Sequence, residues 1–220
     1  MSEIALARQS AVEKSKPARG RPRDTEKNTA IIDAASQLFL ENGFDGTSMD
    51  EVAKRAGVSK QTVYSHFSSK EQLFGDAIHI TIEKYFPDEV LKNVEARTLE
   101  ADLTSVATKF ARLLMSKDAM AMHRVLVAAA HKGPGLAEIF WEAGPKEMIV
   151  KLAGFLKVWV DKGELEIDDL EKAAGLLISL LKGKLHFEMS IGLFDQVSDE
   201  ALQAHVHDSV ACFLKLYKKN

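Results

Sequence analysis

The sequence has little cysteine and no long apolar run. Cys212 is the single cysteine among 220 residues, so no intramolecular disulfide can form, and we expect a cytoplasmic protein. No stretch approaches the roughly 20 apolar residues that a membrane helix needs. Residues 1–20 carry charges along their length and lack the apolar segment of a signal peptide. These absences exclude a disulfide scaffold and predict no membrane partner.

The residue patterns of enzymes and metal sites are also missing. No serine lies in a nucleophile-elbow glycine pattern, and no glycine-rich loop could cradle a phosphate. His205 and His207 are two apart and therefore lie on different faces of a helix. Asp76 and His79 form one carboxylate-x-x-His spacing, whereas a helical di-iron site needs two Glu-x-x-His copies and two further carboxylates. We therefore expect no catalytic residue, no metal and no cofactor.

The alternating apolar pattern of β-strands is absent too. Apolar residues instead recur at helical spacing from Ile31 to Tyr217. Glycine and proline divide these helical segments at Asn42-Gly43, Pro87, Gly133-Pro134-Gly135, Gly144-Pro145 and Gly163. The sequence thus predicts an all-α protein, with an unbroken helix over about Asp168–Ile191 and a last one over Ser198–Tyr217.

Positive charge is concentrated near the N-terminus. The net charge is −3, but Lys and Arg outnumber Asp and Glu in residues 1–70, while residues 71–220 are acidic. Two prolines and a glycine within residues 16–23 predict a flexible basic arm over residues 1–23. Its Arg19, Arg21 and Arg23 either solubilise the chain or contact the DNA minor groove and phosphates. We favour the DNA role because the charge is confined to this end.

The segment Thr47–Lys70 carries the functional signal. Two short helices surround the Ala56–Ser59 turn, which is the arrangement of a helix-turn-helix whose second helix enters the DNA major groove. Val63 and Phe67 lie four residues apart and should face inward together with Val58. The polar side chains between them should then face outward, where they could contact base edges and phosphates.

In these residues the sequence resembles the TetR/AcrR family of bacterial regulators. The likeness covers roughly Thr25–Ile78 and includes Gly43-Phe44, Thr47-Ser48, Ala56-Gly57-Val58-Ser59, Thr62-Val63-Tyr64, His66-Phe67 and Ser69-Lys70-Glu71. Gln61 departs from the glycine that many members have. The rest of the chain is similar to the AefR-like C-terminal group. The resemblance implies an N-terminal three-helix helix-turn-helix domain over residues 24–75 and a C-terminal helical bundle for ligand binding and dimerisation over residues 76–220.

The resemblance also implies roles for individual residues. It implies base contacts from Lys60, Gln61, Thr62 and Ser65, and phosphate contacts from Thr47 or Ser48, Tyr64, His66 and Lys70. It implies a ligand pocket lined by Met115, Met122, Phe140, Trp141, Phe155 and Trp159, although Met and Trp at helical spacing are more often plain core. The expected partners are double-stranded operator DNA, a second copy of the chain bound through the last two long helices, and a small-molecule inducer.

Several functions fit these residues. The first is a repressor that binds a near-palindromic operator as a dimer and is released by an apolar or amphipathic ligand. The second is an activator, or a regulator that needs no ligand. The third is a helical-bundle enzyme or carrier with a vestigial helix-turn-helix, for which the sequence offers no catalytic residues.

Overall fold

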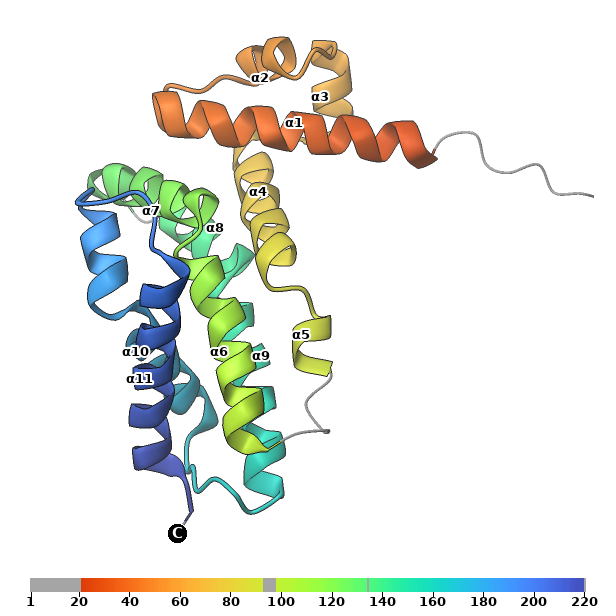
Figure 1. Cartoon of the computed structure of the whole chain (residues 1–220). Coiled ribbons are helices and arrows are strands. Elements are labelled where there is room, and N and C mark those ends of the chain that lie inside the picture. The colour runs from red at the N-terminus through yellow and green to blue at the C-terminus, as the bar shows by residue number, and fades with distance from the viewer. Residues whose placement is uncertain (1–20, 93–97, 134, 220) are drawn as a thin grey trace, which may run out of the picture.

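The computed structural model describes residues 21–92, 98–133 and 135–219, and within them it is all-α. Figure 1 shows a helical layer at one end of the molecule and a helical bundle below it. The layer consists of α1 (Arg21–Asn42), α2 (Met49–Arg55) and α3 (Lys60–His66). The bundle consists of α4 (Lys70–Tyr85), α5 (Glu89–Lys92), α6 (Leu99–Leu114), α7 (Lys117–Ala129), the 3₁₀ turn Ala130–Lys132, α8 (Gly135–Ala143), α9 (Pro145–Asp161), α10 (Leu170–Ser190) and α11 (Asp199–Tyr217). The predicted fold class is confirmed.

Polar side chains fix where most helices begin. Ser48, Ser59, Ser69 and Ser198 each accept a hydrogen bond from a backbone N–H two or three residues into the following helix. This contact satisfies one of the N–H groups that the first turn of a helix leaves without a partner. A serine directly before an apolar helical segment is therefore a good sequence indicator of where that helix begins.

Helix α1 begins earlier than predicted. The flexible arm was expected to reach residue 23, but Arg21–Arg23 already belong to α1, so the arm prediction is wrong for these three residues. Pro22 lies in the first turn, where its missing N–H has no intrahelical acceptor and its fixed φ suits a helix. Arg19 and the rest of the expected arm lie outside the described residues.

The predicted helix over about Asp168–Ile191 is present as α10, but it contains a kink that the sequence did not indicate. Gly183 has φ 46° and ψ −154°, which interrupts the helical geometry between two helical segments. A Cβ there would lie 2.6 Å from Cε1 of His205 on α11, so the backbone approaches this ring closely. The kink carries the last turns of α10, which include His186, in a new direction.

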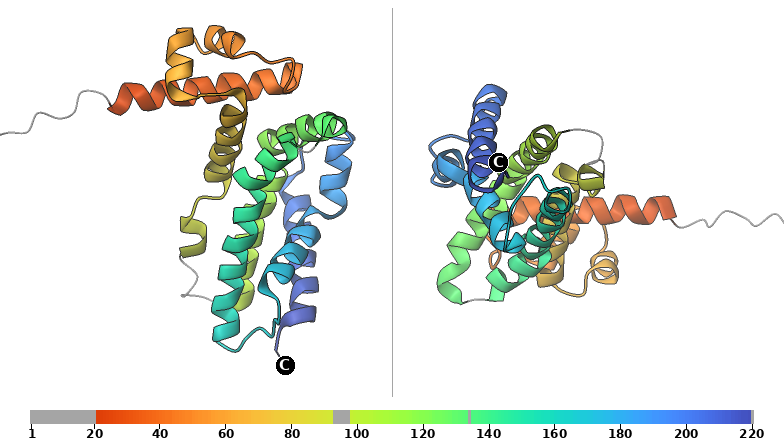
Figure 2. Two further views of the ribbon diagram at one scale, coloured as in Figure 1. Left: turned by 180° about the vertical axis from the view of Figure 1, so that it is seen from behind. Right: turned by 90° about the horizontal axis from the view of Figure 1, so that it is seen from below.

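Two contacts join the layer to the bundle. Helix α4 starts directly after α3 and continues into the bundle, packing against α1, α6, α7 and α8 (Figures 1 and 2). Helix α1 also packs against α7. The predicted domain boundary at residue 75 therefore falls inside a continuous helix that contacts both the layer and the bundle.

Candidate nucleic-acid interface and ligand cavity

The turn between α2 and α3 holds α3 at the surface. Gly57 has φ 68°, a left-handed conformation that glycine adopts without the steric cost other residues meet. Val63 and Phe67 are buried, at 0% and 2% exposure, and anchor the inner face of α3. An aromatic cluster of Phe39, Phe44 and Phe74, with ring centroids 5.4–5.6 Å apart, forms the core beneath.

The outer face of α3 is polar and open to solvent, as the sequence predicts. Lys60, Gln61, Tyr64 and Ser65 are exposed, while Thr62 and His66 are half-buried. Lys60 Nζ donates to Asp50 on α2 at 2.9 Å, and this ion pair raises the pKa of Lys60. The charged end of Lys60 is thereby held over the start of α2, beside the Tyr64 ring.

Two predicted phosphate contacts are engaged inside the protein. Thr47 is 2% exposed and its hydroxyl donates to the carbonyl of Gly43 at 2.8 Å, so only Ser48 of the predicted pair faces solvent. Lys70 Nζ donates to the carbonyls of Phe44 and Thr47 at 2.7 and 2.9 Å and lies 4.5 Å from the Phe44 ring centroid. Lys70 therefore ties α4 to the loop before α2, a structural role that sequence reasoning missed.

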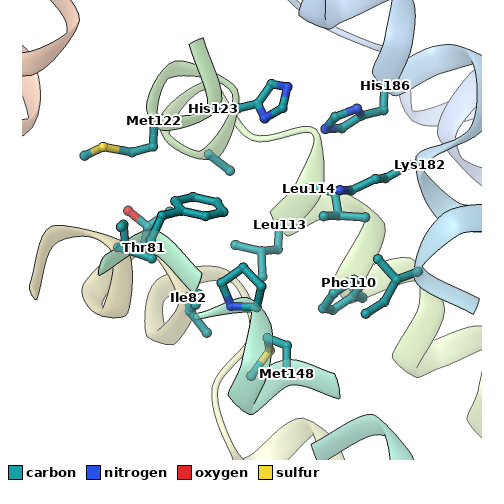
Figure 3. A pocket seen from close by; sticks show the side chains of 15 residues that line it. Thr81, Ile82, Phe110, Leu113, Leu114, Met122, His123, Met148, Lys182 and His186 are labelled. Atoms are coloured by element: carbon teal, nitrogen blue, oxygen red, sulfur yellow. The ribbon is translucent and has the colours of Figure 1, made fainter. Parts of the chain in front are cut away.

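The bundle contains a cavity of about 150 Å³ between six helices. Its lining residues are Ile78, Thr81, Ile82, Phe110, Leu113, Leu114, Ala119, Met122, His123, Phe140, Pro145, Met148, Ile178, Lys182 and His186. Figure 3 shows His123, His186 and Lys182 together on one side, with Ile82 and Met148 across the cavity. An engineered apolar cavity of about this volume holds benzene, so a small organic body fits here.

The structure brings only two of the six predicted pocket residues to this cavity, Met122 and Phe140. Phe155 and Trp159 are buried at 3% and 1% exposure, and Met115 is similarly buried, but none of them lines the cavity. Trp141 is 47% exposed and points away from the core. Helical spacing identified apolar residues correctly, but it could not tell which of them face a shared space.

The polar end of the cavity was not predicted at all. His123 comes from α7, whereas Lys182 and His186 come from the two sides of the kink in α10. The two imidazole rings lie 5.4 Å apart at an interplanar angle of 64°. The four-residue spacing of Lys182 and His186 was the one available signal, and the third member is distant in sequence.

The described residues contain neither a membrane-spanning helix nor a metal-binding cluster. No helix among them is long and apolar enough to cross a membrane. No group of three or more His, Cys, Asp or Glu side chains in these ranges is placed to hold a metal ion.

An exposed polar helix held by a glycine turn, joined by a rigid helix to a bundle with a cavity, is the architecture of a helix-turn-helix regulator. Residues 31–77 match the family model described as bacterial regulatory proteins of the tetR family. Residues 101–219 match the AefR-like transcriptional repressor C-terminal domain. The chain therefore belongs to the TetR family of transcriptional regulators.

Relatives agree over nearly the whole chain. The uncharacterized HTH-type transcriptional regulator YdeS of Bacillus subtilis is 31% identical over 87% of this chain and 90% of its own. A TetR-family regulator structure from Mesorhizobium loti is 32% identical with a TM-score of 0.77, covering 90% of this chain and 99% of that one. The structure of the flavonoid-responsive regulator FrrA is 34% identical with a TM-score of 0.67, covering 89% and 99%. These relatives are regulators rather than enzymes.

Proposed function

We propose that this protein is a transcriptional repressor that binds a near-palindromic operator as a homodimer and releases it when a small ligand enters the bundle. The observation that carries the proposal is the polar outer face of α3, exposed on a helix whose inner face is anchored by Val63 and Phe67. Repression rather than activation is supported by the family model that matches the C-terminal domain, which is described as an AefR-like transcriptional repressor. An activator would use the same DNA contacts.

The exposed residues of α3 divide by position into two roles. Lys60 and Gln61 occupy its first turn, and in helix-turn-helix proteins the N-terminal residues of this helix contact base edges. Thr62 and Ser65 assist them in the proposal. In the proposal, Ser48, Tyr64 and His66 contact phosphates, and Lys70 joins them if DNA displaces its internal hydrogen bonds.

Selection of the operator from random DNA, followed by affinity measurements at several salt concentrations, tests this assignment. Gln61→Ala should cost about 1–3 kcal/mol and relax the base preference at one position. Lys157→Ala, on the exposed surface of α9, is the matched control and should leave binding unchanged. An unchanged preferred operator in both Gln61→Ala and Lys60→Ala would refute the base-reading roles. A promoter fused to a reporter then distinguishes repression from activation.

Dimerisation is proposed through α10 and α11. Leu177 and Leu181 of α10 are fully buried in the protomer, so they cannot form the interface. Phe187, Ile191 and Leu216 are instead 62%, 57% and 63% exposed. Phe187 and Ile191 lie at the end of α10 and Leu216 near the end of α11, and large exposed apolar side chains are typical of an interface. Pairing through α10 and α11 would place the two α3 helices of the dimer about 34 Å apart, which is one turn of DNA.

Light scattering at micromolar concentration tests the dimer. Phe187→Glu should shift the protein toward a monomer because it places a charge in the proposed interface. Val150→Glu changes an equally exposed apolar residue on α9 and should leave the dimer intact. A native protein that is monomeric under these conditions would contradict the proposal.

Ligand release is proposed to act through α4. Ile78, Thr81 and Ile82 of this helix line the cavity, and the same helix begins directly after α3. A ligand that favours one position of α4 would change the distance between the two α3 helices of the dimer. The ligand shifts that equilibrium only by its difference in affinity for the two states, commonly about 1–3 kcal/mol. The relative FrrA is described as flavonoid-responsive, which supports a small organic ligand.

The coupling must be reciprocal, and this provides the test. Operator DNA should weaken ligand binding by the same factor by which the ligand weakens operator binding. Calorimetry of ligand binding with and without operator DNA measures this factor directly. A compound that releases the operator yet binds equally well with and without DNA would contradict the mechanism.

A further inference from the structure

The cavity is chemically asymmetric. The residues that α4, α6, α8 and α9 contribute to its lining include no ionisable side chain. The ionisable lining comes from α7 and α10 alone, as His123, Lys182 and His186. Each of these groups is cationic or can become so, and no carboxylate lines the cavity. A ligand that fills this space therefore meets apolar walls and one basic end (Figure 3).

Within the described residues, the basic end has no ion-pair or hydrogen-bond partner, and Lys182 is exposed. In residues 21–92, 98–133 and 135–219, Lys182 forms no ion pair, although its neighbour Lys184 pairs with Glu188 at 3.4 Å. The described part of the chain likewise offers no hydrogen bond to the His123 or His186 ring, which contact each other. Both rings are half-buried and their nitrogens are not fully enclosed, so they are available to hydrogen-bond a ligand in the cavity.

The protonation of the two rings is consistent with this arrangement. Burial, then the charge of Lys182, then His123, lowers the pKa of His186 to about 4. Burial, then Lys182 and Arg124, also lowers the pKa of His123. Both rings are therefore largely neutral at pH 7, and the neighbourhood disfavours further positive charge. An anion placed here would offset the charge of Lys182 and accept hydrogen bonds from the rings.

We propose that the cavity binds a small amphipathic acid, whose apolar body lies among the walls from α4, α6, α8 and α9 and whose anionic group lies against Lys182, His123 and His186. This assignment deepens the proposed ligand response and rests on it for its biological meaning. The anionic group can belong to an aliphatic or an aromatic acid, which share the same head chemistry. The sequence alone suggested an apolar pocket without basic residues, and the structure replaces that picture.

Calorimetry with matched probes on the full-length protein tests the assignment. Octanoate is compared with octan-1-ol, and 4-ethylbenzoate with 4-ethylbenzyl alcohol, so that each pair differs in the head group alone. Hydrogen bonds to a charged group should make the acids bind about 10–100-fold more tightly than their alcohols. The pair that binds more tightly distinguishes an aliphatic from an aromatic ligand.

Variants on one helix assign the preference to its residue. Lys182→Met should reduce the acid preference to less than about threefold while leaving the affinity for the alcohols unchanged. Lys184→Met, which removes an exposed lysine two residues away, should keep the preference. The thermal midpoint of each variant, measured in parallel, shows that it is folded. Equal binding of acid and alcohol, a preference that survives Lys182→Met, or no binding of any probe at millimolar concentration would overturn the assignment.

Operator binding is measured separately, without probes, so that the two proposals can fail independently. Acids that bind with the expected preference but leave the operator complex intact would support the cavity assignment and refute release by such ligands. A protein that selects no operator while showing the acid preference would refute the proposed repressor alone.

Discussion

Replacing Gly183 by alanine should destabilise the protein and disturb the basic end of the cavity together. Gly183 stands between Lys182 and His186, with φ 46° and ψ −154°. This conformation is strongly unfavourable for a residue that carries a Cβ. The Cβ would also approach Cε1 of His205 to 2.6 Å. The His205 ring cannot move away freely, because its Nε2 lies 2.8 Å from the Leu181 carbonyl in a hydrogen bond.

The magnitude follows from these two contributions. Backbone strain of this kind costs about 1–3 kcal/mol. Displacing His205 forfeits a hydrogen bond that contributes about 1 kcal/mol. The free energy of unfolding should therefore fall by about 2–4 kcal/mol. At about 2–4 °C per kcal/mol for a chain of this size, the thermal midpoint should fall by roughly 4–16 °C.

Calorimetry and urea unfolding at one fixed protein concentration check this value, since the stability of a dimer depends on concentration. Gly154→Ala is the matched control, because Gly154 is exposed within α9 and a Cβ there meets nothing within 4 Å. That substitution should instead stabilise by about 0.5–1 kcal/mol. If Gly183→Ala is as stable as Gly154→Ala, the kink is not a strained feature of the fold. If it is destabilised yet keeps the full acid preference, the kink does not position Lys182 and His186.

Three further predictions concern single side chains. Lys70→Met should lower the free energy of unfolding by about 1–3 kcal/mol in urea titrations, because two carbonyls lose their charged donor; an unchanged stability would mean that its internal bonds contribute nothing. Asp50→Asn should tighten operator binding by up to about fivefold in fluorescence anisotropy, because it removes a negative charge beside DNA and releases Lys60 from an exposed ion pair; weaker binding would argue against Lys60 at the interface. The thermal midpoint of the native protein should fall as the pH decreases from 6.5 to 5, since the unfolded chain binds a proton at His186 that the folded protein, with a pKa of about 4, does not. His186→Gln should flatten this dependence, and an unchanged slope would exclude His186 as a contributor.

The sequence by itself determined the features that depend on neighbouring residues. Ser48, Ser59 and Ser69 start their helices because each hydroxyl bonds to the backbone within one turn. Gly57 makes the turn between α2 and α3, and the four-residue spacing of Val63 and Phe67 fixes which face of α3 is exposed. These local rules allowed the helix-turn-helix and its outward-facing residues to be predicted, and the same residues identified the family.

Only the tertiary structure decided the features that join distant segments. Lys70 lies 26 residues from Phe44, and no local pattern indicated that its ammonium would bond to that loop. The kink at Gly183 brings its backbone against the ring of His205 from another helix, a contact that the apolar pattern of α10 does not indicate. His123 reaches Lys182 and His186 only because α7 packs against α10. Helical periodicity predicts which face of a helix is buried, but it does not predict which residues of other helices pack against that face. Those residues determine the chemistry of the cavity.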